Sequence, residues 1–107
     1  MKYQVYFTDD AVIDLEEIYD YIYTNDHPLK AEQLLNNIEQ ACLSLKEQPT
    51  RGSFVKELLA LGIHEFREIF FKPYRIIYKQ LEKNIYIYLV ADGRRDMQTL
   101  LERRLLQ

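Results

Sequence analysis

The spacing of apolar residues divides the chain into a helical N-terminal half and a strand-rich C-terminal half. Residues 2–7 alternate apolar and polar positions, which predicts a short strand. Residues 9–24 and 28–47 carry apolar side chains three and four positions apart, which predicts two amphipathic helices joined by a short connection. Thr8 and the two aspartates after it suit the start of the first helix, and Pro28 suits the first position of the second.

After the loop at Gly52, the pattern changes to runs of β-branched and aromatic residues. Three such runs, separated by turn-like breaks, predict an antiparallel meander over residues 63–71, 74–81 and 85–91. Residues 54–61 are ambiguous between strand and loop. Asp96 can cap a last helix. The side chains of that helix expected to point inward are Met97, Leu100, Leu101 and Leu105.

These elements predict an α+β domain with the order β-α-α-β-β-β-α. The helical hairpin is expected to pack on one face of a mostly antiparallel sheet, with the first strand at an edge and a helix at the C-terminus. A length of 107 residues is that of one domain, so residues 1–107 are expected to form a single unit. The opposite face of the sheet has no predicted cover and is where such a domain can bind a partner.

Charge is distributed unevenly along the chain. Residues 1–50 carry three basic and ten acidic residues, a net charge of −7, whereas residues 51–107 carry eleven and seven, a net charge of +4. This disfavours a protein that grips nucleic acid over its whole surface, but the C-terminal half can face an anionic or acidic partner. The acidic run on the first helix is typical of a solvated helix face with favourable placement near the N-terminus.

The remaining composition excludes several classes of protein. A single cysteine, Cys42, cannot build a disulfide framework or a multi-cysteine zinc site, and its place on an apolar helical stripe predicts a small buried hydrophobe. No apolar run approaches the roughly 20 residues that span a bilayer. The N-terminus lacks the pattern of a signal peptide, so a cytoplasmic location is expected. The separate histidines His27 and His64 and the lack of a glycine-rich phosphate loop predict neither metal nor cofactor.

Arginines of the C-terminal half are the candidate site residues. Cleavage of RNA without a metal needs cations that stabilise the charge of the phosphorane, together with a general acid or base. The chain offers four such cations near its strands: Arg67, Arg75, Arg94 and Arg95.

The turn after residue 71 decides whether Arg67 and Arg75 can act together. With a two-residue turn, Phe70 opposes Arg75 and the two arginines lie on opposite faces; with a three-residue turn at 72–74, Phe71 opposes Arg75 and they share a face. We expect the second register, because burial of apolar side chains decides register more strongly than a turn preference. That register gathers four apolar residues on the other face: Phe66, Phe70, Ile76 and Tyr78.

Several short motifs follow one another in a distinctive order. They are residues 11–21 (Ala-x-x-Asp-Leu-x-x-Ile-x-x-Tyr), Leu45 with Pro49 and Gly52, Arg67, residues 74–78 (Tyr-Arg-Ile-Ile-Tyr) and residues 92–96 (Asp-Gly-Arg-Arg-Asp). This ordered set covers nearly the whole chain and resembles the ParE/RelE superfamily of toxins from bacterial type II toxin–antitoxin modules. It is most similar to the ParE, or plasmid-stabilisation, branch.

The resemblance implies a toxin that arrests growth and is neutralised by a cognate antitoxin, whose disordered segment folds on it within a higher-order toxin–antitoxin complex. ParE-like members are associated with inhibition of DNA gyrase by protein binding and have no established catalytic site. RelE-like members instead cut messenger RNA in the ribosome. Fold alone does not choose between the two, and a third interpretation is an interaction domain without toxicity.

Comparison of single positions with the RelE-like pattern favours the binding toxin. Arg75 matches the strand arginine of that pattern and Arg95 matches the basic residue after the last strand, while Arg67 stands where the pattern has a lysine. Leu101 stands where the pattern has a tyrosine, which removes a group for proton transfer or base stacking. An isoelectric point of about 5.4 also fits poorly with docking in a ribosome. If the protein is a metal-free endoribonuclease instead, Arg67, Arg75 and Arg95 are its catalytic residues.

We expect the gyrase or other topoisomerase target, or the antitoxin, to contact the basic residues, the C-terminal helix and a pair of tyrosines. Tyr86 and Tyr88 share one strand face, opposite Ile85, Ile87 and Leu89, and exposed aromatics commonly anchor interfaces. The residues assigned to binding are Arg67, Arg75, Tyr86, Tyr88, Arg94, Arg95, Leu101, Arg104 and Leu105.

Two structural alternatives stay open for these residues. Arg75 can pair with a carboxylate such as Glu68 or Asp92, because buried charges need partners. Tyr86 and Tyr88 can pack against the C-terminal helix instead of meeting a partner.

Overall fold

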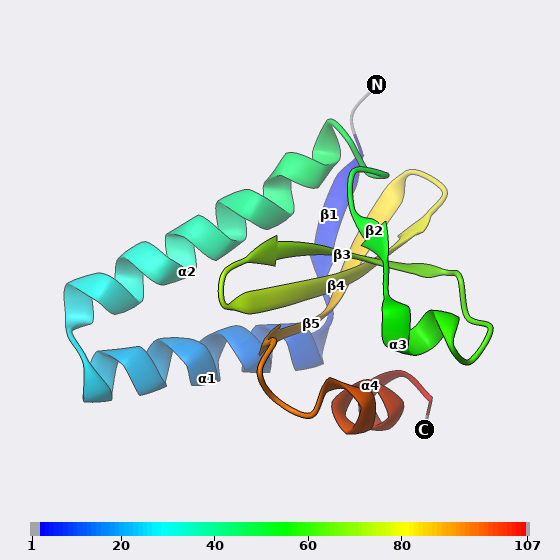
Figure 1. Cartoon of the computed structure of the whole chain (residues 1–107). Coiled ribbons are helices and arrows are strands. Elements are labelled where there is room, and N and C mark those ends of the chain that lie inside the picture. Colours follow the sequence, from blue (N-terminus) through cyan, green and yellow to red (C-terminus); the bar gives the residue numbers. More distant parts are fainter. Residues whose placement is uncertain (1–2, 107) are drawn as a thin grey trace.

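The computed structural model describes residues 3–106, which form one five-stranded sheet with helices on both of its faces (Figure 1). The strands are β1 (Gln4–Phe7), β2 (Ser53–Phe54), β3 (Phe66–Phe71), β4 (Tyr74–Leu81) and β5 (Asn84–Asp92). The helices are α1 (Asp9–Asn25), α2 (Pro28–Leu43), α3 (Lys56–Leu59) and α4 (Met97–Leu105), with a 3₁₀ turn η1 (Ser44–Lys46) after α2. Residue 2, predicted in the first strand, lies outside the described residues.

The three longer helices, α1, α2 and α4, each begin after a residue whose side chain caps the helix. The Thr8 hydroxyl accepts a hydrogen bond from the Ala11 backbone N–H (3.1 Å), and the Asp96 carboxylate accepts one from the Thr99 N–H (3.1 Å), as predicted for both positions. Pro28 lies in the first turn of α2, also as predicted, and the His27 ring accepts from the Leu29 N–H. The starting positions of α1, α2 and α4 are therefore set by local sequence.

The strand order across the sheet is β1-β5-β4-β3-β2. β1 lies at one edge, as predicted, and pairs in parallel with β5, while the other pairs are antiparallel. Figure 1 shows α1 and α2 joined at one end and separating towards the sheet, with α3 and α4 on the other side. The ambiguous segment 54–61 contains the end of β2 and the short helix α3, and the predicted strand 63–71 begins only at Phe66.

The expected register between β3 and β4 is wrong. Phe70 pairs with Arg75 and Arg67 pairs with Tyr78, which is the two-residue turn at residues 72–73. Arg67 and Arg75 therefore lie on opposite faces of the sheet. Phe70 is left 58% exposed in this register, so burial of the aromatic ring did not decide the pairing.

A β-bulge changes the predicted faces of β5. Ile77 pairs with Leu89 but the next residue, Tyr78, pairs with Ile87, so Tyr88 is the additional residue. Leu89 consequently packs on the α3–α4 side of the sheet, whereas Ile87 packs on the α1–α2 side. The expectation that Leu89 shares a face with Ile85 and Ile87 is wrong for this reason.

Two hydrophobic cores lie on the two faces of the sheet. The larger one joins α1, α2 and η1 to the sheet and contains the buried Cys42, as predicted. The second joins α3 and α4 to the face that the sequence left without a cover, through residues such as Leu58, Met97 and Leu101. Burial raises the pKa of the Cys42 thiol to about 12, which leaves it protonated and unreactive.

Tyr78 ties the loop before β2 to the sheet. Its hydroxyl donates to the Pro49 carbonyl (2.6 Å) and accepts from the Gly52 N–H (3.1 Å). A Cβ atom at Gly52 would lie 2.5 Å from the Glu68 carbonyl oxygen, so only glycine allows this close approach of loop and strand.

Candidate functional site

The structure does not gather the predicted arginines into one basic face. Arg67 donates to the Gly52 carbonyl (2.8 Å) and its guanidinium lies 4.3 Å from the centre of the Phe54 ring. Arg75 lies on the other face, and Arg94 and Arg95 follow β5. The prediction of a shared surface for the four is therefore wrong, because the β3–β4 register separates the first two.

Arg75 is enclosed by two glutamates. Its Nε donates to Glu68 Oε1 (2.6 Å), and its two terminal nitrogens donate to the Glu57 carboxylate (2.8 and 2.7 Å). The residue is 7% exposed and Glu68 is 5% exposed. Glu68 is one of the two partners predicted for Arg75, and Glu57 was missed because α3, which carries it, falls in the ambiguous segment. The hydrogen bonds that Arg75 donates to Glu57 raise the pKa of Arg75, so the guanidinium stays charged and is neutralised by its carboxylate partners.

Arg94 and Arg95 lie on the surface beyond β5. Arg94 binds the Asp92 carboxylate through Nε (2.9 and 3.2 Å) and is 81% exposed, the setting of a weak pair. Both arginines line a hollow of about 440 Å³ between α1 and the end of β5, together with Tyr21 and Tyr74. These two cations are therefore accessible to a partner.

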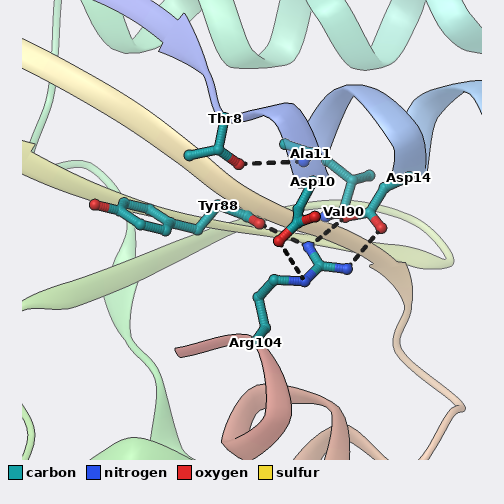
Figure 2. A network of polar contacts seen from close by, with 7 residues as sticks. All are labelled: Thr8, Asp10, Ala11, Asp14, Tyr88, Val90 and Arg104. Atoms are coloured by element: carbon teal, nitrogen blue, oxygen red, sulfur yellow. Dashed lines mark hydrogen bonds and ion pairs between the residues drawn. The ribbon is translucent and has the colours of Figure 1, made fainter. Parts of the chain in front are cut away.

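Arg104 fastens α4 to α1 and β5, as Figure 2 shows. Its two terminal nitrogens bind the Asp14 carboxylate (2.9 Å each) and one of them also donates to the Tyr88 carbonyl (2.8 Å). The Asp14 carboxylate accepts a further hydrogen bond from the Val90 N–H (2.9 Å), while Asp10 lies 3.8 Å from the guanidinium. Arg104, predicted to bind a partner, is thus engaged inside the molecule.

Leu101 and Leu105, the other predicted residues of α4, differ in exposure. Leu101 is fully buried in the second core, so its predicted contact with a partner is wrong. Leu105 is partly exposed at the end of the helix and packs against the same core. The buried face of α4 thus holds the helix in place and leaves its outer face for contacts.

The tyrosines of β5 belong to a row of side chains across the sheet. Tyr6, Tyr86, Lys79 and Phe66 are successive cross-strand neighbours. The rings of Tyr6 and Tyr86 are stacked (centroids 5.6 Å apart), and Tyr88 packs edge-on against Phe66 (5.3 Å). Tyr88 also packs against the second core, to which α4 contributes, in line with the alternative that it packs against the C-terminal helix. Tyr86 is half-exposed.

Carboxylates that bind arginine make the fold sensitive to acid. Arg75 holds the pKa of Glu57 below its usual value, and Arg94 holds the pKa of Asp92 at about 2. A carboxyl group with a depressed folded-state pKa contributes stability above its unfolded pKa, and that stability is lost as the pH falls through the folded value. We expect the free energy of unfolding, measured by urea denaturation, to decrease as the pH falls below about 4.

Two variants identify which pair causes the acid sensitivity. Glu57→Gln should give a shallower pH dependence, because the buried pair is removed. Asp92→Asn should change it little, because its partner Arg94 is exposed to solvent. Superimposable pH profiles for the wild type and Glu57→Gln would contradict this assignment.

Within residues 3–106, no cluster of three or more His, Cys, Asp and Glu side chains is arranged to hold a metal ion. The helices of the same part of the chain are all too short or too polar to cross a membrane.

Comparisons with known proteins agree on the class of this chain. The family model of the ParE toxin of the type II toxin–antitoxin system parDE matches residues 5–97. A solved chain of the chromosomal ParDE toxin–antitoxin system from P. aeruginosa has a TM-score of 0.71 with 19% identity, over 85% of this chain and 96% of that one. No curated protein matches the sequence. The fold is therefore that of the RelE/ParE-like toxins, and the chain belongs to the ParE toxin family of type II toxin–antitoxin systems.

Proposed function

We propose that this protein arrests growth by binding DNA gyrase or a related topoisomerase in the cytoplasm, and that a cognate antitoxin neutralises it. One observation carries the proposal: Arg75, the arginine that a RelE-like nuclease would use, is buried and bound to two glutamates. A cation neutralised inside the protein cannot stabilise a phosphorane on a bound RNA.

Two further features favour binding over RNA cleavage. Arg67 and Arg75 lie on opposite sheet faces, so they cannot contact one phosphate, and Arg95 lies beyond the last strand. Leu101 occupies the place of the pattern's tyrosine and is buried in the core. The alternative function, a ribosome-dependent endoribonuclease, would need these groups to converge on a substrate.

The surface offered to the target contains the accessible members of the predicted set. Arg94 and Arg95 supply positive charge beside the aromatic rings of Tyr21 and Tyr74, and arginines and aromatic residues are enriched at protein interfaces. The outer face of α4 is exposed and Tyr86 is half-exposed, but neither lines this hollow. We therefore place the principal target contact at the end of β5.

The test is a gyrase supercoiling assay with the purified toxin. We expect inhibition by the wild type and at least about tenfold weaker inhibition by the double variant Arg94→Ala/Arg95→Ala, the size of a lost interface hot spot. Arg51→Ala/Lys83→Ala is the matched control, because it removes two exposed cations from loops that do not line this hollow. Unchanged supercoiling at a large excess of toxin that still arrests growth would overturn the proposal.

Cells that express the toxin separate the two candidate functions. Arrest with induced DNA damage and intact transcripts is expected for a topoisomerase inhibitor. Arrest with cleaved messenger RNA and no DNA damage would instead support the endoribonuclease.

A further inference from the structure

The hollow between α1 and the end of β5 combines an apolar lining with a charged turn. Ile18 and Ile22 of α1 and Val90 of β5 line it, and its volume of about 440 Å³ is within the range of sites that enclose a ligand. Ile22 is partly exposed and packs in neither of the two hydrophobic cores. The hollow therefore offers apolar surface that the fold itself does not use.

Asp92 fixes the turn that carries the two arginines of the hollow. Its carboxylate accepts hydrogen bonds from the Arg94 backbone N–H (2.9 Å) and from Arg94 Nε (2.9 Å), and its backbone carbonyl accepts from the Arg95 N–H (3.1 Å). Arg94 keeps its terminal nitrogen Nη1 unbonded, and the Arg95 side chain forms no ion pair within residues 3–106. The turn therefore holds two adjacent guanidinium groups ready for a partner, which reduces the entropy that binding costs.

The charges around the hollow form a dipole. At the turn, two arginines and one aspartate give a net charge of +1, whereas α1, the opposite wall, carries six carboxylates and no basic residue. Asp14 is bound by Arg104, and the charge of Glu17 acts on the same guanidinium. A DNA backbone laid across the hollow would be repelled along α1, but a single carboxylate at the turn would be attracted.

Two tyrosines add hydrogen-bond donors beside the arginines. Tyr21 on α1 is 66% exposed, Tyr74 at the start of β4 is partly buried, and both line the hollow. Burial raises the pKa of the Tyr74 phenol, so the phenol stays protonated at neutral pH. Neither hydroxyl forms a hydrogen bond within residues 3–106, so both can donate to a carboxylate.

We propose that the hollow receives a protein segment of the topoisomerase in which an aspartate or glutamate binds Arg94 and Arg95 and a neighbouring apolar side chain packs on Ile18 and Ile22. The inference rests on the proposed function and specifies the chemistry of the target contact. Charge complementarity selects this occupant, because the positive turn matches one carboxylate and the acidic α1 disfavours the DNA that the enzyme holds. Arginine also matches a carboxylate with two parallel hydrogen bonds.

The experiment measures binding of the dye-labelled toxin to purified gyrase without DNA, by fluorescence anisotropy at several salt concentrations. Arg94→Gln/Arg95→Gln removes the charge of the turn, and we expect at least about tenfold weaker binding at low salt and a smaller effect of salt than in the wild type. Arg51→Gln/Lys83→Gln makes the same change of net charge in loops that do not line the hollow, and we expect a change below about threefold.

A second pair of variants tests the apolar lining. Ile22→Asn places an uncharged polar group in the hollow, and we expect at least about fivefold weaker binding that salt does not change. Ile13→Asn is the matched control, because Ile13 lies on the same helix and is 48% exposed but does not line the hollow. Circular dichroism and thermal melting of each variant verify that the fold is retained.

The outcomes separate the hollow from the proposed function. Gyrase binding that the glutamine pair and Ile22→Asn weaken no more than their controls would overturn the hollow and leave gyrase as the target. Absence of binding by the folded wild type, with or without DNA, would overturn both. Binding to duplex DNA alone, or to gyrase only when DNA is present, that the glutamine pair abolishes would assign the arginines to phosphate and would also overturn the inference.

Discussion

Replacing Arg75 by alanine is expected to lower the free energy of unfolding by about 3–5 kcal/mol, the cost of leaving buried charge without its partner. Glu68 is 5% exposed, and the Glu57 carboxylate is mostly buried beside it. Without the guanidinium, two carboxylates face one another in a region from which water is largely excluded. Urea denaturation at pH 7 followed by circular dichroism measures the change.

Arg94→Ala is the matched control for this prediction. Arg94 also binds a carboxylate with several hydrogen bonds, but its side chain is 81% exposed. We expect a far smaller loss than for Arg75→Ala, because exposed ion pairs contribute little to stability. Equal losses for the two variants would show that burial does not determine the strength of the Arg75 cluster.

An apolar replacement of the whole cluster tests whether Arg75 has a role beyond structure. Arg75→Met combined with Glu57→Leu and Glu68→Leu removes all three charges, and replacement of a buried ion cluster by apolar residues is often neutral or stabilising. We expect this variant to fold and still to arrest growth, because Arg75 contacts neither target nor substrate in the proposed function. A stable but non-toxic variant would assign Arg75 to the toxic activity.

Local sequence signals predicted most of the helices and strands correctly. Thr8, Pro28 and Asp96 each set the start of a helix through one capping group or a fixed backbone angle, and such effects act within a few residues. The apolar stripes of the two long helices were equally informative, since each helix covers the sheet with one face.

Interactions between distant residues decided the features that the sequence did not predict. In the observed β3–β4 register, Glu68 and Arg75 meet Glu57, which comes from a four-residue helix too short to give a periodic pattern. The bulge at Tyr88 is likewise invisible in a single strand, because it is a mismatch between two. The register divided the candidate basic face, and the bulge changed the face of Leu89.

The contacts of Arg104 that hold α4 against α1 and β5 were not predicted, for the same reason. Asp14 and Arg104 are 90 residues apart in the chain, and Asp14 is one of many carboxylates on an acidic helix. Its position facing β5 distinguishes it from its neighbours, since its side chain is only 11% exposed. An acidic run that indicated a solvated face therefore contained one structural residue.

Replacing Asp14 by alanine is expected to cost about 2–3 kcal/mol, because a largely buried Arg104 loses its carboxylate and the Val90 N–H loses its acceptor (Figure 2). Asp10→Ala is the matched control: Asp10 is 64% exposed and 3.8 Å from the same guanidinium, so its loss should stay below about 1 kcal/mol. In a double-mutant cycle of Asp14→Ala and Arg104→Ala, measured by urea denaturation, the two losses should be strongly non-additive. Additive losses would mean that the pair does not hold α4, and the helix would then be held by its apolar side chains in the second core.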